Sequence, residues 1–269
     1  MSSLLKTEWL KIKKYPAFWW MFGIVSLSYP GMNYAIYYGG YKDQLADKKM
    51  GPILSLMPNP FTFPDVWQTV SFISSVFVFL PSIVVIMFIT NEYSYKTHRQ
   101  NIIDGWSRNQ FMLSKMIDVA IITLIVTLLY TITAFVIGTV NAGEGSGSSW
   151  AGTKYIGLFF LQQFSQLSLA LLIALLVRRA FIALGIFLFY YFPFEPLLTN
   201  LAREYKYSFG EYLPLETSDR LIPFPRWFVE DEKEWNRLVA ESDSHILYTI
   251  LLLGLTWGLC FWINKKRDL

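Results

Sequence analysis

The sequence predicts an all-α integral membrane protein with six transmembrane helices and two shorter helices at the membrane surface. Each of six apolar runs approaches the roughly 20 residues that a helix needs to cross a bilayer core about 30 Å thick. The runs are continuous rather than alternating, which indicates helices instead of the strands of a membrane barrel. The predicted spans cover residues 16–38, 66–90, 112–140, 155–177, 180–198 and 246–263.

The composition agrees with this fold class. Of the 269 residues, 54% are hydrophobic and only 16% are charged, whereas a soluble domain is roughly 25% charged. Six spans and their loops use almost the whole length. We therefore expect a single transmembrane domain, residues 1–269, without room for a separate catalytic domain.

Side chains that could carry out catalysis or bind a metal ion are scarce. The single cysteine, Cys260, lies in the last span, and His98 and His245 are the two histidines, both outside the apolar runs. No Cys/His spacing typical of a metal site occurs. An intramembrane enzyme would need a nucleophile with a base, paired acids or clustered histidines inside the spans. We expect no catalytic residue, no metal and no cofactor on this chain.

The distribution of charge predicts the orientation in the membrane, because short cytoplasmic loops carry an excess of Lys and Arg. If the N-terminus is cytoplasmic, the inside segments hold thirteen basic and five acidic residues, and the outside holds ten basic and fifteen acidic ones. Both termini and the segment 91–115 are therefore expected in the cytoplasm, and the large loop 199–245 outside. The predicted location is the bacterial cytoplasmic (inner) membrane.

The N-terminal residues 3–14 can form a short helix with Leu5, Trp9 and Ile12 on one face. Such a helix would lie in the interface of the inner leaflet. The alternative is a disordered basic flank.

The polar segment between the second and third spans predicts a second surface helix at about 93–104. At helical spacing, one face carries Tyr95, Arg99, Ile102 and Trp106, and this pattern is typical of an amphipathic helix parallel to the membrane. The other face carries Lys96, Thr97, Gln100, Asn101 and Asp104. Taken alone, the pattern also fits an ordinary amphipathic connector.

Local patterns predict how this helix and its neighbours end. Gly105 is a natural stop, and Ser107 with Gln110 forms a capping box that starts the next helix. Pro81 is expected to kink the second span, and Lys115 with Asp118, three residues later, to form an ion pair.

The turn between the fourth and fifth spans is short. Only a few residues around Val177-Arg178-Arg179 link the two apolar runs, so these helices should be antiparallel neighbours. The two arginines suit lipid headgroups, with contact to a partner as the alternative.

The order of residues in 91–115 resembles the signature of permease subunits in the type-2 ABC exporter family. In that family an acidic residue ends the second span, a Thr-x-Arg helix follows, and a Ser-Arg-x-x-Phe-x-x-x-Lys stretch enters the third span. The opening segment 5–11 also resembles the start of such permeases. Many relatives have a glycine before the threonine, where this chain has Lys96. The matching residues are Glu92, Thr97, Arg99, Gln100, Gly105, Ser107, Arg108, Phe111 and Lys115.

The resemblance implies a membrane subunit of an ATP-driven exporter. Such permeases pair with a second copy or a related permease and dock on two cytoplasmic ABC ATPase subunits through the surface helix, which acts as a coupling helix. This chain has no Gly-x-x-x-x-Gly-Lys-Ser/Thr motif, so ATP and Mg would be bound by the partner ATPase. Membrane lipids are the other expected partner, and nucleic acid is not. The residues assigned to coupling are Glu92, Thr97, Arg99, Gln100, Asn101, Asp104 and Arg108.

Polar side chains inside the spans are candidates for a translocation path. Gln162 and Gln166 lie on one face of the fourth span, Thr127 belongs to a threonine series at four-residue spacing, and Glu195 lies between two prolines at the outer end of the fifth span. Interhelical hydrogen bonds, or threonines bonded to their own helix, are the alternative for the uncharged groups. Glu195 could serve as an outer gate or face the outer headgroups. A non-catalytic membrane scaffold or sensor is the alternative function.

Overall fold

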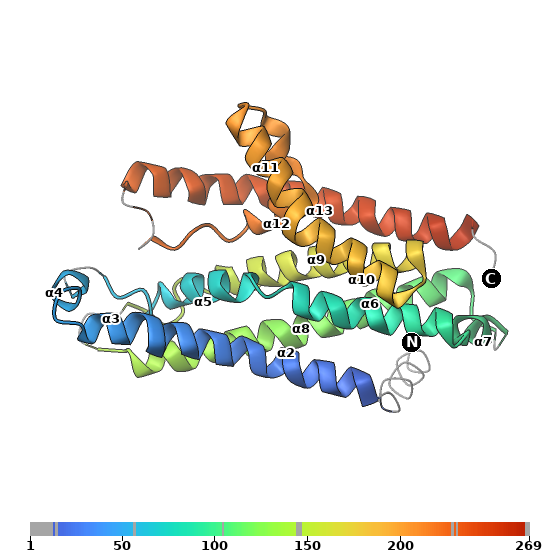
Figure 1. Ribbon diagram of the computed structural model, residues 1–269, viewed down its shortest axis with the longest axis horizontal. Coiled ribbons are helices and arrows are strands. Elements are labelled where there is room, and N and C mark those ends of the chain that lie inside the picture. Colours follow the sequence, from blue (N-terminus) through green and yellow to red (C-terminus); the bar gives the residue numbers. More distant parts are fainter. Residues whose placement is uncertain are drawn as a thin grey trace.

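The computed structural model describes residues 13, 16–55, 58–103, 105–143, 147–226, 229 and 231–266. Throughout these residues every regular element is a helix, which confirms the all-α prediction. The long helices lie side by side along the long axis of the molecule (Figure 1). Apart from Lys13, the predicted interfacial helix at 3–14 lies outside the described residues, and so does Asp104.

Four helices are long and apolar enough to cross a membrane: α8 (Arg108–Val140), α9 (Lys154–Val177), the continuous helix Ala180–Glu204 and α13 (Glu232–Lys266). A fifth span results if two bent helices at 66–94 are counted together. The predicted first span, α2 (Pro16–Ala35), is not in this set, because its Trp, Tyr, Ser and Asn residues lower its mean hydropathy. The structure therefore supports four or five candidate spans, and the count of six is not confirmed.

The first helix extends beyond its predicted end at residue 38. The π-helix η1 (Ile36–Lys42) and the short α3 (Asp43–Ala46) continue α2 without a break. α4 (Gly51–Leu54) follows in the loop.

The second predicted span is broken. α5 (Val66–Ser75) and α6 (Phe79–Ser94) meet at an angle of 49°. The cause is Pro81, which has no N–H to donate to the carbonyl of Phe77 four residues earlier. The Tyr29 hydroxyl of α2 reaches that carbonyl at 3.4 Å. The predicted kink is thus a break that lies just before the proline.

The predicted turns around α8 and α9 are confirmed. Ser107 Oγ accepts from the Gln110 N–H at 3.2 Å and Gln110 Oε1 from the Ser107 N–H at 2.8 Å, which completes the capping box at the start of α8. α9 ends at Val177 and α10 (Ala180–Phe189) begins three residues later and packs against it. Gly105, just after α7 (Thr97–Ile103), has φ +97°, a conformation that suits glycine.

The loop between the fifth and sixth predicted spans is largely helical. α10 continues through the π-helix η2 (Tyr190–Phe194) into α11 (Glu195–Glu204), which leaves the direction of the bundle (Figure 1). The short helices η3 (Ser208–Tyr212) and α12 (Pro214–Asp219) then return the chain to the bundle, where α12 packs against α9 and α13. Loop residues therefore reach the interior, between the long helices.

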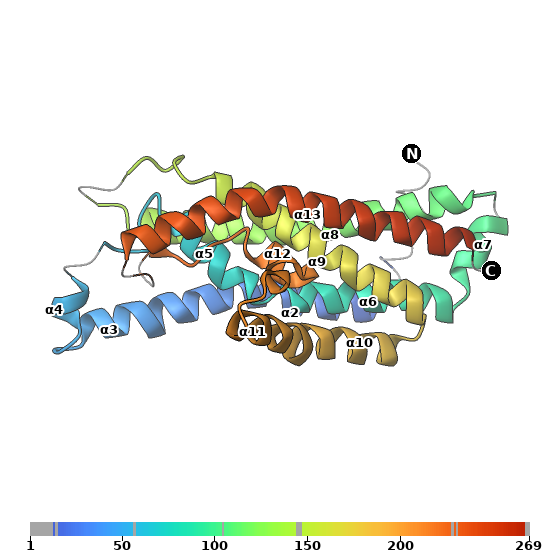
Figure 2. The same ribbon diagram turned by 90° about the horizontal axis from the view of Figure 1, so that it is seen from above.

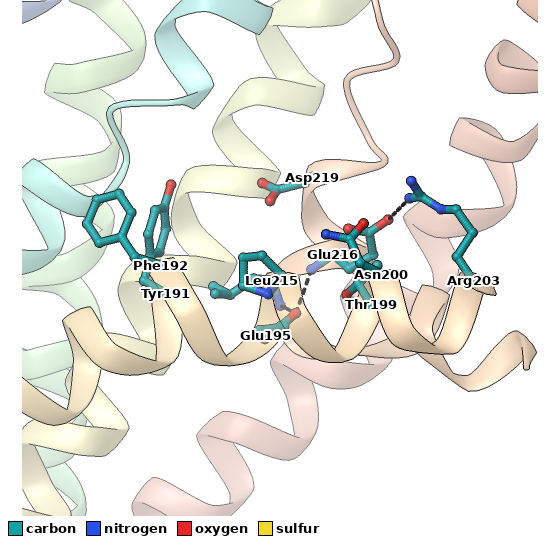
Figure 3. Close-up of a pocket in the computed structure, with 10 residues that line it drawn as sticks. Tyr191, Phe192, Glu195, Thr199, Asn200, Arg203, Leu215, Glu216 and Asp219 are labelled. Carbon is teal, nitrogen blue, oxygen red and sulfur yellow. Dashed lines mark hydrogen bonds and ion pairs between the residues drawn. The ribbon is translucent and has the colours of Figure 1, made fainter. Parts of the chain in front are cut away.

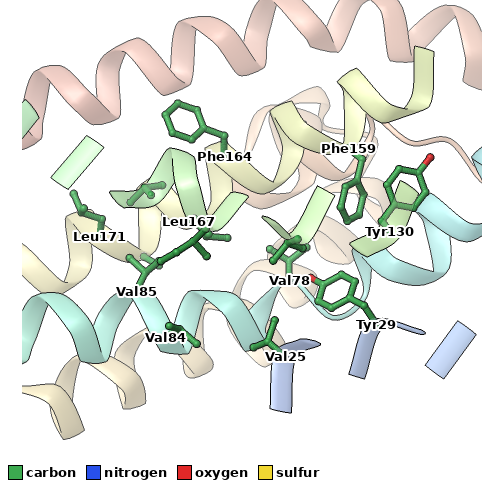
Figure 4. Packing of buried hydrophobic residues seen from close by; sticks show 14 of the residues in the cluster. Val25, Tyr29, Val78, Val84, Val85, Tyr130, Phe159, Phe164, Leu167 and Leu171 are labelled. Carbon is green, nitrogen blue, oxygen red and sulfur yellow. The ribbon is translucent and has the colours of Figure 1, made fainter. Parts of the chain in front are cut away.

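Helix α9 forms the centre of the bundle. It packs against α5, α6, α8, α10, α12 and α13. The most apolar stretch of α9 is 61% buried, against 17% for that of Ala180–Glu204 at the periphery. Phe159 of α9 contacts the ring of Tyr130 at 4.6 Å and that of Tyr29 at 6.4 Å between centroids, so aromatic side chains join α2, α8 and α9 (Figure 4).

The predicted cytoplasmic segments gather at one end of the bundle. α7, the last turns of α13 and the turn between α9 and α10 lie together, whereas α3 and α4 lie at the opposite end (Figures 1 and 2). This separation is what the charge-based topology requires.

Candidate functional site

A buried ion cluster fixes the end of α6 to the beginning of α8. The ammonium nitrogen of Lys115 lies 2.9 Å from Glu92 Oε1 and 2.9 Å from Asp118 Oδ2, and Lys115 is fully buried. The predicted pair of Lys115 with Asp118 is confirmed. The pair with Glu92, 23 positions away in the sequence, was not predicted. Moving α6 and α8 apart would leave buried charges unpaired, which is costly. The contact therefore holds the two helices together.

The α7 helix begins later than predicted. Lys96 has φ +56°, which breaks the helical path between α6 and α7. Beyond this break, Thr97 Oγ1 donates to the Glu92 carbonyl at 3.3 Å, and His98 Nδ1 lies 3.2 Å from the same oxygen. Burial lowers the pKa of His98, so the neutral imidazole is favoured. Glu92 thus holds α8 with its carboxylate and α7 with its carbonyl.

The structure corrects one part of the predicted partner face. Asn101 is only 4% exposed, so its side chain is not available to a partner. Gln100 is exposed, as predicted, and Thr97 is half-buried. Arg99, which was predicted on the membrane-facing side of the helix, is exposed as well. Ile103, which the sequence analysis did not assign to coupling, is 77% exposed.

Arg178 connects α7 to the turn between α9 and α10. Its guanidinium lies 4.7 Å from the centroid of the Tyr93 ring, and that ring lies 4.5 Å from the imidazole of His98. Arg178 caps α9 in the left-handed conformation, with φ +57°, which costs roughly 1–2 kcal/mol for a residue with a Cβ. Arg178 therefore contacts protein at the base of the bundle, rather than serving only as a headgroup anchor.

Arg108 connects the beginning of α8 to the end of α13. Its guanidinium donates to the carbonyls of Asn264 and Lys265 at 3.3 and 2.6 Å, and Asn264 Nδ2 donates back to the Arg108 carbonyl at 2.8 Å. α7 therefore packs against α6 and α8, and these two helices in turn contact the α9–α10 turn through Tyr93 and α13 through Arg108.

A second polar cluster lies where α12 meets α9. Gln162 and Gln166 donate to the same oxygen of Asp219 at 2.8 and 2.7 Å, and Gln166 also donates to Ser218 Oγ at 2.9 Å. The carboxylate of Asp219 is thus held by two neutral amide donors from α9. Asp219 belongs to the predicted outside loop 199–245, and its contact with α9 spans too many positions to be predicted from local spacing.

Glu195 holds α12 in place. Its Oε1 accepts the N–H groups of Leu215 and Glu216 at 2.6 and 2.7 Å, and its side chain is only 2% exposed (Figure 3). The alternative in which Glu195 faces the outer headgroups is therefore wrong. Its predicted role in a translocation path is not tested by this geometry.

The threonines of α8 mainly donate to carbonyls of their own helix, which was the predicted alternative to a role in the translocation path. Thr123 donates to the Val119 carbonyl at 2.8 Å and Thr131 to that of Thr127 at 2.7 Å. Thr127 is buried, and its hydroxyl has no hydrogen-bond partner among the described residues. No hydrogen bond of these residues joins Thr127 to Gln162, Gln166 or Glu195.

Several apolar helices of membrane-crossing length define a multi-pass membrane protein. Residues 4–194 match the sequence model of the ABC-2 family transporter proteins. This match covers most of the chain, so the chain belongs to the ABC-2 transporter family and is a transport permease, in agreement with the predicted resemblance. No curated protein matches the chain. The family match ends at Phe194, before α11, α12 and α13.

Proposed function

We propose that this chain is the membrane-spanning permease subunit of an ATP-driven exporter in the bacterial cytoplasmic membrane. A separate cytoplasmic ATPase would supply the hydrolysis, with ATP and Mg bound on that partner. The observation that carries this proposal is the position of α7, which exposes Arg99, Gln100 and Ile103 and packs against α6 and α8.

The contacts of α7 suggest how movement of the ATPase would reach the bundle. Pushing α7 would act on α6 and α8 through Glu92 and Lys115, and on the α9–α10 turn through Tyr93 and Arg178. Both connections are short, and the first is fully buried, so they would transmit displacement rather than absorb it. The central position of α9 would pass the change to most other helices.

Two features complete the proposed assembly. α2 packs against α5, α6 and α8 and would serve as a further membrane helix, which gives the expected six. A second copy of the permease, or a related chain, would form the other half of the pathway. The end that holds α7 would face the cytoplasm, with loop 199–245 on the outer side.

Co-purification with the ATPase tests the proposal. Arg99→Glu and Ile103→Asp change the exposed face of α7 without touching a buried side chain, so the permease should fold normally. Each variant is expected to lose most of the bound ATPase and most export. Lys49→Glu, an exposed charge reversal between α3 and α4 at the opposite end, is the matched control and should retain both.

Two further variants test the helix itself. Gln100→Pro breaks α7 at a cost of about 3 kcal/mol, and charge reversal at Glu92 disrupts the ion cluster; both should uncouple ATP hydrolysis from export. The permease alone should not hydrolyse ATP. If the Arg99 and Ile103 variants keep the ATPase bound and export at full rate, α7 is only a connector and the scaffold or sensor alternative gains support.

A further inference from the structure

A cavity of about 270 Å³ lies between η2, α11 and α12. Figure 3 shows Asp219 and Glu195 on its walls, with Tyr191 and Phe192 at one end and Arg203 at the other. The side chains come from two segments of the chain, which Glu195 holds together through its bonds to the beginning of α12.

Asp219 lies near the middle of the long axis of the bundle, and its side chain is exposed to the cavity. Its partners Gln162 and Gln166 are about 12 and 18 Å from the beginning of α9, a helix about 36 Å long at 1.5 Å per residue. At roughly the middle of a membrane-crossing helix an ionised carboxylate is costly unless a positive charge or water compensates it. One oxygen of Asp219 accepts both amides, and the side chain remains exposed to the cavity.

Hydrogen-bonding groups without partners surround this carboxylate. The hydroxyl of Thr199, a residue that lines the cavity and is 6% exposed, forms no hydrogen bond among the described residues. The side-chain carbonyl oxygens of Gln162 and Gln166 are also buried without a donor in that part of the structure. Buried polar groups normally find partners, and the two carbonyl oxygens specifically lack donors within the described part of the chain.

The local charges leave the cavity negative. Arg220 pairs with Glu216 at 2.9 Å, and Arg203 lies 3.9 Å from the same carboxylate. Within the described residues no ion pair reaches Asp219 or Glu195. Arg220 and Arg203 therefore compensate Glu216. Among the described residues, Asp219 and Glu195 have no cation beside them.

The remaining walls favour an organic cation over a metal ion. Tyr191 and Phe192 present aromatic rings, whose faces attract ammonium and guanidinium groups. The described residues contain no group of three or more His, Cys, Asp or Glu side chains arranged to hold a metal ion.

We propose that this cavity binds a positively charged organic group, an alkylammonium or guanidinium, of the molecule that the permease exports. The proposal rests on the exporter function and names its substrate chemistry. Asp219 compensates the charge of the group, Thr199 accepts a hydrogen bond from it, and Tyr191 and Phe192 contact its alkyl part. Glu195 holds α12, and hence Asp219, in place and adds a second negative charge to the cavity wall.

Binding to the purified full chain tests this assignment. The probe is a dansyl-labelled pentylammonium, and its neutral N-acetylated analogue reports binding by the apolar part alone. Asp219→Asn keeps an oxygen that can accept both glutamine amides, so the fold should persist. Glu204→Gln is the matched control, an exposed acid at the end of α11 outside the cavity.

We expect the ammonium probe to bind the wild type and the Glu204 variant equally, and at least tenfold more weakly to Asp219→Asn. The neutral analogue should bind at least tenfold more weakly to the wild type. Equal binding of the probe to wild type and Asp219→Asn, or equal binding of probe and analogue, would overturn the proposal.

The same probe separates this proposal from the exporter function. If the ATPase binds α7 but the probe shows no dependence on Asp219, only the cation site is wrong. If the probe binds as expected but no ATPase associates with the permease, the cavity keeps its cation specificity and the exporter function is wrong.

Discussion

Lys115 of α8 contacts Glu92 of α6 through a 2.9 Å ion pair between two buried side chains that are 23 positions apart in the sequence. The pair lies at the base of α7, and the backbone carbonyl of the same glutamate accepts a bond from Thr97. One residue therefore sets the position of two helices, and the consequences can be measured.

Lys115→Met should destabilise the protein strongly. The substitution removes the cation shared by Glu92 and Asp118, and breaking such a buried pair costs about 3–5 kcal/mol. Glu92→Gln should cost less, since Lys115 keeps Asp118 as a counterion. Thermal unfolding of the purified protein in detergent gives the order, with Lys49→Met as an exposed control. Equal unfolding temperatures for all three variants would show that the cluster is not structural.

Arg178→Gly should weaken coupling more than stability. Glycine relieves the left-handed strain at φ +57°, which should stabilise the protein by about 1–2 kcal/mol. Loss of the contact with Tyr93 should destabilise it by a similar amount, about 0.5–2 kcal/mol. The unfolding temperature should hardly change, and export per ATP hydrolysed should fall. Arg179→Gly removes a charge from the same turn without that ring contact and should export normally. Normal export by the Arg178 variant would exclude this connection from coupling.

Glu195→Gln should keep membrane expression and lower export. The amide oxygen of glutamine can still accept the N–H groups of Leu215 and Glu216, whereas the negative charge beside the cavity is lost. Glu195→Ala removes the acceptor as well and should lower the unfolding temperature, because hydrogen bonds to a charged group contribute about 1.5–3 kcal/mol each. Expression level, unfolding temperature and export are measured together. Full export by Glu195→Gln would remove this residue from the pathway.

Single cysteines test the orientation in the membrane. Cys260 is buried and is first replaced by alanine. Cysteine at Ser94, which is exposed at the end of α6, should react with a membrane-impermeant thiol reagent only after the cells are opened. Cysteine at Ser208, exposed in η3, should react in intact cells. The reverse pattern would invert the topology predicted from charge.

The sequence by itself determined the helical fold class, the family and the local features. The capping box of Ser107 and Gln110, the short turn before Ala180 and the pair of Lys115 with Asp118 all join residues at most a few positions apart. Helical geometry brings such residues together whatever the rest of the chain does. An apolar run of membrane length likewise predicts a helix whichever other helices pack against it.

Only the tertiary structure decided which polar groups meet. Asp219 belongs to a charged loop, and it meets Gln162 and Gln166 across 57 and 53 positions because α12 folds back between the long helices. The burial of Asn101 and the contact of Arg178 with Tyr93 likewise depend on helix packing. Hydropathy averages along a helix and does not indicate which of its faces a distant segment will cover. The physical reason is that water hydrates the carboxylate and the amides separately in an unfolded chain, and only a packed bundle makes each the other's partner.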